Sequence, residues 1–179
     1  IVSQTKHRHM SRIKEIAPAD MTGEQTTVFE QLTAGRGRIL TPYKVWIHSP
    51  KVAAGMEHIG TFLNKKSSLS TREVEICIIL IARHWHGEYV LDAHIRGARE
   101  AGVPEAAIEA ICGGVDPKLP DPHENAVYRF ASALISGIKL ADKDFAEVEA
   151  ALGRTGIAEV LVLLGYYTSV ALAMKVHEV

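Results

Sequence analysis

The stretch REVEICIILIARHWHGEYVLDAH, residues 72–94, decides the fold and holds the densest cluster of ionisable side chains in the chain. Ser70-Thr71-Arg72-Glu73 at its start forms a capping box, in which Ser and Glu side chains satisfy the first free N–H groups of a helix. The apolar run that follows, residues 74–82, is rich in isoleucine and could also form a buried strand. The cap and the length of the run favour a helix.

Similar start and stop signals divide the rest of the chain into helices. Thr22 opens a second capping box, Ser49-Pro50 is an N-cap followed by a proline, and Asp121 begins a third capping signature. Residues 35–48 contain two glycines and a proline and are predicted to form a loop. No segment shows convincing strand-like alternation, so the sequence predicts an all-α fold of about seven helices. The start and stop signals themselves delimit eight segments, at residues 22–35, 50–63, 70–82, 87–101, 104–113, 121–137, 142–152 and 157–176.

Length and composition indicate one soluble globular domain. A chain of 179 residues can bury a proper core, and 47% hydrophobic with 23% charged residues excludes a disordered protein. The formal net charge is −1 and the Lys and Arg residues are scattered, which argues against a nucleic-acid or anionic-membrane surface. We therefore expect a single domain over residues 1–179, with an N-terminal arm over residues 1–21.

The cysteines and the N-terminal residues favour the cytoplasm. Cys77 and Cys112 lie in apolar helical surroundings and are expected to be reduced, buried residues. Residues 1–14 lack the apolar region of a signal peptide. The longest uncharged run, residues 160–174, is short for a membrane span and is predicted to be a buried helix.

Spacing alone gives a limited view of the chemistry. If the helix that starts at residue 71 continued through His86, then Glu75, Arg83 and His86 would share one face. Such a group is more often a structural ion-pair network than a catalytic site. His84 and His86 point to different sides of a helix and no further ligand completes a set, so no metal site is predicted. The sequence also lacks a Gly-x-Ser-x-Gly nucleophile motif and a phosphate-binding loop.

A distinctive pattern runs through residues 69–113. It consists of Leu69-Ser70-Thr71-Arg72-Glu73, Ile81-Ala82-Arg83, Glu88-Tyr89, His94 and Ala101-Gly102-Val103-Pro104-Glu105. This pattern resembles the carboxymuconolactone decarboxylase and alkylhydroperoxidase D superfamily, and the resemblance extends less specifically to residues 42–50, 165–168 and 176–179. It implies an alkylhydroperoxidase D-like helical domain that assembles as a homo-oligomer, as a dimer, trimer or hexamer.

The peroxidase branch of this superfamily requires a Cys-x-x-Cys motif that the chain lacks. Aligned on His94, the sequence places Glu75 at the position of the family's glutamate, but Gly87 and Val90 where the two cysteines should be. Without an activated thiolate and a resolving thiol, peroxide reduction through a disulfide has no route. A thiol-dependent antioxidant protein is therefore the disfavoured alternative.

The decarboxylase branch needs no cysteine and no cofactor, because the substrate's own conjugated carbonyl accepts the electrons. The resemblance implies that Arg83 binds a carboxylate or polarises a lactone oxygen, and that His94 is the general acid/base. Glu75 would orient His94 or share its proton. Further substrate contacts are expected from His86, Glu88 and Tyr89.

The expected function is that of a lyase acting on a small lactone or conjugated carboxylic acid, as in the breakdown of aromatic compounds. The first 40 residues do not resemble the short dedicated muconolactone enzymes of protocatechuate breakdown, so the substrate stays open. Another acid/base reaction on the same scaffold and a non-catalytic small-molecule-binding protein also stay open.

Overall fold

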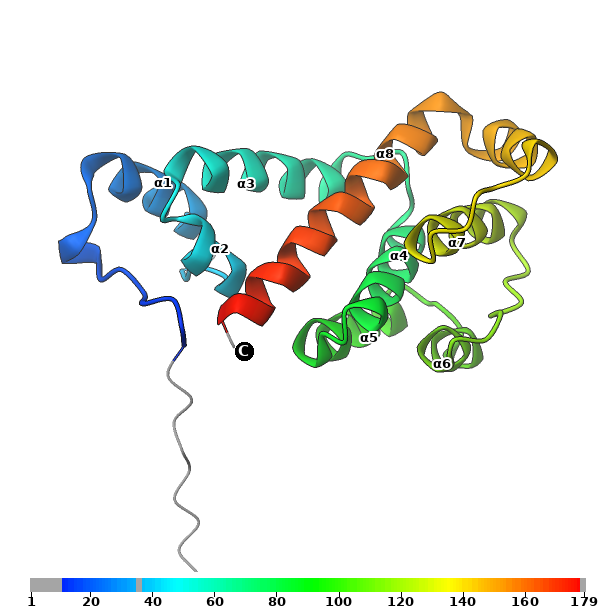
Figure 1. The fold of residues 1–179 in the computed structure, drawn as a ribbon, viewed down its shortest axis with the longest axis horizontal. Coiled ribbons are helices and arrows are strands. Elements are labelled where there is room, and N and C mark those ends of the chain that lie inside the picture. The colour runs from blue at the N-terminus through cyan, green and yellow to red at the C-terminus, as the bar shows by residue number, and fades with distance from the viewer. Residues whose placement is uncertain (1–10, 35–36, 178–179) are drawn as a thin grey trace, which may run out of the picture. The chain divides into compact units, whose positions relative to one another are not determined.

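The computed structural model describes residues 11–34 and 37–177. Within these residues the regular structure is entirely helical (Figure 1), so the predicted all-α fold is confirmed. The predicted helix end at Gly35 and residues 1–10 of the predicted arm lie outside the described residues. The elements are a 3-10 turn η1 (Pro18–Asp20) and the helices α1 (Gly23–Thr33), α2 (Thr41–Trp46), α3 (Pro50–Lys65), α4 (Thr71–His84), α5 (Glu88–Glu100), α6 (Glu105–Gly113), α7 (Pro122–Ile135) and α8 (Asp142–His177).

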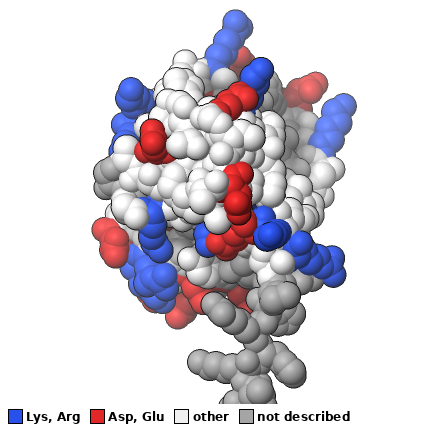
Figure 2. Space-filling model, turned by 90° about the vertical axis from the view of Figure 1, so that its left-hand side faces the viewer, with Lys and Arg blue, Asp and Glu red and all other residues white. Residues whose placement is uncertain are grey.

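The chain forms two compact units. One consists of residues up to 54 together with those from 172 onward, and the other of residues 55–171. In the first unit, the predicted capping box of α1 is present, because Thr22 and Gln25 exchange backbone-to-side-chain hydrogen bonds of 2.9 and 3.3 Å. The predicted loop over residues 35–48 is wrong in part, since α2 forms within it. The face in Figure 2 carries both signs of charge, interspersed among uncharged residues.

Helix α4 is the core of the second unit. Its capping box forms as predicted: the Ser70 N–H donates to Glu73 Oε2 at 2.7 Å, and the Glu73 N–H donates to Ser70 Oγ at 3.2 Å. The helix packs against α5, α6 and α7, and Ile76, Ile78 and Ile79 are fully buried. A helix covered on several sides is apolar nearly all round, which explains the isoleucine run that resembled a strand.

Buried charges join the start of α4 to the start of α7. The Arg72 guanidinium reaches Glu124 at 2.6 Å and donates to the Gly102 carbonyl at 2.9 Å. The Glu73 carboxylate also accepts a hydrogen bond from His123 Nδ1. Because Glu73 and Glu124 are buried, these partners offset the cost of removing two carboxylates from water.

The connection between α4 and α5 corrects one prediction. Helix α4 ends at His84, and His86 has a left-handed backbone with φ of 53°. The His86 N–H donates to the Arg83 carbonyl and the Gly87 N–H to the Ala82 carbonyl, the pattern of a Schellman end. The helix therefore does not continue to His86, and the expected common face of Glu75, Arg83 and His86 on one helix does not form.

Replacing His86 with glycine is expected to stabilise the fold by about 1 kcal/mol, because glycine adopts the left-handed conformation without steric cost. Urea unfolding of the purified variant measures this gain. His84→Gly is the matched control, since His84 is also exposed but lies in the last turn of α4, where glycine should cost a few tenths of a kcal/mol. A His86→Gly variant no more stable than the parent would contradict the assignment of strain.

Helix α8 is interrupted at Gly153, where φ is 62° and ψ is 178°. The two helical segments predicted on either side of this glycine are thus confirmed, joined by a kink. By length and composition alone α8 could cross a membrane. However, 44% of its most apolar window is buried within the protein, and the core helix of a soluble protein passes the same test.

Candidate functional site

The structure brings Glu75 of α4 and His94 of α5 into direct contact. His94 Nδ1 lies 2.8 Å from Glu75 Oε2, and the two side chains are 23% and 13% exposed. A hydrogen bond from Nδ1–H to the carboxylate fixes the ring orientation and leaves Nε2 to accept or donate a proton. The arrangement is therefore a carboxylate-oriented imidazole that is partly exposed.

The Glu75 carboxylate of α4 packs closely against the backbone of α5. A Cβ atom added at Gly97, one turn beyond His94 on α5, would lie 2.8 Å from Glu75 Oε1. Only glycine leaves the carboxylate enough room against the α5 backbone. Sequence reasoning did not identify Gly97, because a glycine inside a helix gives no sign of what packs against it.

Tyr167 of α8 packs against the His94 ring. The two rings meet edge to face with centroids 5.3 Å apart, and Tyr167 is buried. Burial is the main cause that raises the pKa of Tyr167 above its usual range, while a hydrogen bond from Asn64 acts against it. The phenol therefore stays protonated at neutral pH. Residues 165–168 belong to the less specific part of the family resemblance, and no role was predicted for Tyr167.

The Arg83 side chain is directed to α6 and not to the Glu75–His94 pair. Its Nε–H donates to the Cys112 carbonyl at 3.0 Å, at the C-terminal end of α6. A side chain at Gly114 would collide with the guanidinium. Arg83 therefore satisfies a carbonyl that the end of α6 leaves without a helical partner. The structure joins Glu75 and His94 but places the Arg83 guanidinium against α6.

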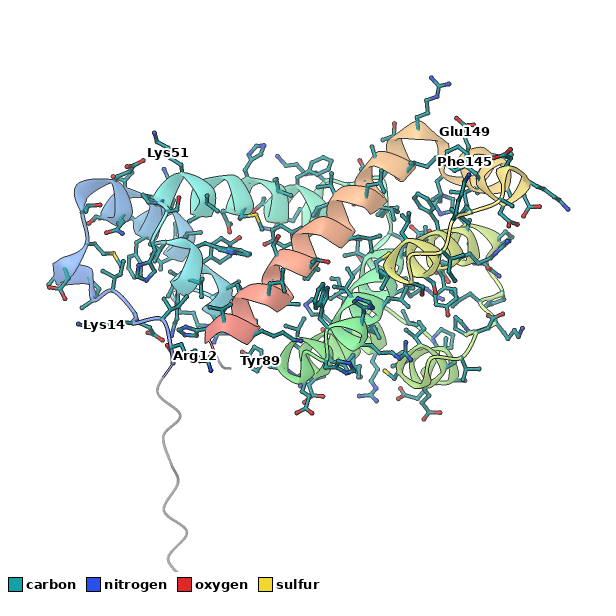
Figure 3. The ribbon with its side chains drawn as sticks, in the orientation of Figure 1. Arg12, Lys14, Lys51, Tyr89, Phe145 and Glu149 are labelled. Carbon is teal, nitrogen blue, oxygen red and sulfur yellow. The ribbon has the colours of Figure 1, made fainter. Side chains whose placement is uncertain are left out.

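The remaining predicted contacts, His86, Glu88 and Tyr89, lie in the α4–α5 turn and the first turn of α5. All three are exposed, and Tyr89 projects from α5 with 56% of its surface accessible (Figure 3). Among the residues that the structure describes, no group of three or more His, Cys, Asp or Glu side chains is placed to hold a metal ion.

Neither cysteine has the surroundings of a reactive thiol. Cys77 is fully buried in α4, and this burial raises its pKa to about 12. Cys112 is partly buried, and burial is the main cause that raises its pKa as well, against the opposing charges of Arg83 and Arg99. Both groups are therefore thiols and not thiolates at neutral pH.

Comparison with known proteins gives a family match over part of the chain, and a fold. The model of the carboxymuconolactone decarboxylase family matches residues 50–133, from the start of α3 into α7. An uncharacterised peroxidase-related protein from Silicibacter sp. TM1040 shares the fold with a TM-score of 0.73 and 15% identity, covering 98% of this chain and 94% of that one. The alkylhydroperoxidase D-like helical fold is thus confirmed.

A second solved structure also shares the fold. It is a variant of the debrominase Bmp8 in complex with 2,3,4-tribromopyrrole, with a TM-score of 0.67 and 12% identity, covering 94% of this chain and 91% of that one. No curated protein gives a significant sequence match. At these identities the two structures support the fold alone.

Proposed function

We propose that this chain, whose residues 50–133 match the model of the carboxymuconolactone decarboxylase family, is a cofactor-free acid/base lyase acting on a small lactone or conjugated carboxylic acid. The observation that carries the proposal is the 2.8 Å hydrogen bond between His94 Nδ1 and Glu75 Oε2. It supplies an oriented imidazole next to a carboxylate, which is the equipment that proton transfer requires.

The proposed reaction uses this pair in one proton transfer. The carbon–carbon bond to the carboxylate breaks, CO2 leaves, and the electron pair moves into the substrate's conjugated carbonyl to give an enolate. Protonated His94 then donates its Nε2 proton to the carbon that lost CO2, while Glu75 stabilises the imidazolium through Nδ1–H. The neutral imidazole regains a proton from water, so the enzyme returns to its starting state.

The chain's thiols argue for this chemistry over peroxide reduction. Gly87 and Val90 occupy the positions of the family's cysteines, and burial raises the pKa of both Cys77 and Cys112. Both cysteines are free, which suits a reducing compartment, so a cytoplasmic location is part of the proposal.

We also propose a homo-oligomer, on the basis of apolar surface along α8. Within the second unit, the neighbouring residues Leu161 and Val162 of this helix are 48% and 46% exposed, and contiguous exposed apolar surface is typical of protein–protein contacts. Light scattering on the purified protein distinguishes a monomer from a dimer, trimer or hexamer.

The function is tested by a turnover screen of the purified protein. Small lactones and β-keto or vinylogous carboxylic acids are offered as substrates, and CO2 release and absorbance are followed. Release of CO2 supports a lyase, whereas conversion without CO2 indicates another acid/base reaction on the same scaffold. Binding without any conversion would leave a non-catalytic binding protein and contradict the proposal.

Alkylation of the thiols is expected to leave turnover unchanged. Iodoacetamide reacts with thiolates, and both cysteines are held as protonated thiols by burial. Activity is measured before and after treatment, and mass spectrometry reports how much label is bound. Loss of activity in step with labelling would favour the thiol-dependent alternative.

A further inference from the structure

A small pocket lies beside the Glu75–His94 pair. It has a volume of about 140 Å³ and lies between the end of α3 and the first turns of α4. Its lining includes Lys65, Lys66 and Glu75 but no residue of α5. Because Glu75 both lines the pocket and hydrogen-bonds to His94, this carboxylate connects the pocket to the imidazole.

The wall formed by the α3–α4 connection is held in place by hydrogen bonds. Both the backbone N–H and the hydroxyl of Ser68 donate to Glu159 Oε2 of α8, at 2.7 and 2.6 Å. The Ser67 hydroxyl donates to the Leu63 carbonyl at 3.2 Å, and Ser70 caps α4. The pocket is therefore formed before any ligand arrives, which lowers the entropic cost of binding.

The charges around the pocket select its ligand. Lys65 and Lys66 are exposed residues of the lining and bring two positive charges to the pocket. The Glu75 carboxylate, which also belongs to the lining, is hydrogen-bonded to His94. Arg83, the cation that the family resemblance offered for a substrate carboxylate, is engaged with the Cys112 carbonyl.

We propose that this pocket binds the carboxylate end of a small organic acid through Lys65 and Lys66, with the ligand lying against Glu75. A pocket of about 140 Å³ has room for a carboxylate and a short carbon chain. That this ligand is the substrate rests on the proposed function. Its binding, however, can be measured without any turnover.

The first test uses succinate as the probe and isothermal titration calorimetry on the whole protein. Lys65→Gln/Lys66→Gln is expected to weaken succinate binding about tenfold, since two partly exposed ion pairs are lost. The matched control is Lys139→Gln/Lys143→Gln, which removes the same charge from two exposed positions, one just before α8 and one in its first turn, and should bind succinate as the parent does. Succinamide, a neutral analogue, should not bind the parent.

The second test asks whether the bound ligand lies against Glu75. Glu75→Gln keeps the shape of the side chain but removes a negative charge, so succinate should bind several-fold more tightly. Unchanged binding in Glu75→Gln, or equal losses in the two lysine pairs, would overturn the proposal. Tighter binding of inorganic phosphate than of succinate would contradict the choice of a carboxylate. Failure of the lyase reaction is recognised separately, by absent turnover in the substrate screen.

Discussion

Replacing His94 with alanine is expected to lower turnover about 10²–10⁴-fold, the contribution typical of a positioned general acid/base. The imidazole is the group that would carry the proton, and its Nδ1 is held by Glu75 at 2.8 Å. The expected loss corresponds to about 3–5 kcal/mol of activation free energy. Steady-state kinetics with a substrate found in the screen measures kcat and kcat/KM for the variant.

The control for His94→Ala is His84→Ala. His84 is an exposed histidine in the last turn of α4, so its loss tests whether any histidine nearby supports activity. Its turnover is expected to match the parent, while circular dichroism should show that both variants keep their helices. A His94→Ala enzyme with a near-parental rate would remove His94 from the reaction.

Replacing Gly97 with alanine is expected to lower turnover about 10²-fold, although glycine-to-alanine changes inside helices normally stabilise a protein. The new Cβ would lie 2.8 Å from Glu75 Oε1, so the carboxylate must move away from α5. A displacement of about 1 Å in a catalytic group is enough for a loss of this size. The same kinetic assay, together with the thermal unfolding midpoint, separates loss of geometry from loss of fold.

Gly55→Ala provides the matched control for Gly97→Ala. Gly55 also lies inside a helix, α3, but a Cβ atom there meets nothing within 4 Å. This variant should keep full activity and gain about 0.5–1 kcal/mol of stability, because alanine loses less backbone entropy on folding than glycine. If Gly97→Ala behaves like Gly55→Ala, the Glu75 carboxylate does not need its present position.

The helices that were predicted correctly begin with local signals. The capping boxes at Thr22 and Ser70 and the cap at Asp121 each depend on contacts within a few residues, which the sequence displays directly. Helix α2 was missed because the glycines before it and Pro42 in its first turn suggested a loop. A proline in the first turn of a helix breaks no hydrogen bond, so Pro42 is compatible with α2.

The site was predictable only where the family pattern named its residues. Glu75 and His94 lie on different helices, and spacing alone could not show that they touch. The expected alignment of Glu75 with Arg83 and His86 assumed a longer α4 than the chain forms. Gly97 of α5 and Tyr167 of α8 pack against the pair, and Asn64 of α3 hydrogen-bonds to Tyr167. Such contacts depend on tertiary packing that no local pattern encodes.

Gly87 and Val90 stand where the peroxidase branch of the family has its two cysteines, and this difference affects how the site responds to oxidants. Catalytic thiolates are progressively oxidised to sulfenic, sulfinic and sulfonic acids. A cysteine in either of the last two forms no longer acts as a nucleophile. A site made of an imidazole, a carboxylate and a phenol has no sulfur to oxidise in this way. If the Glu75–His94 pair acts as proposed, oxidation of this kind would not remove its activity, whereas a site that depends on a thiolate would lose its reactive group.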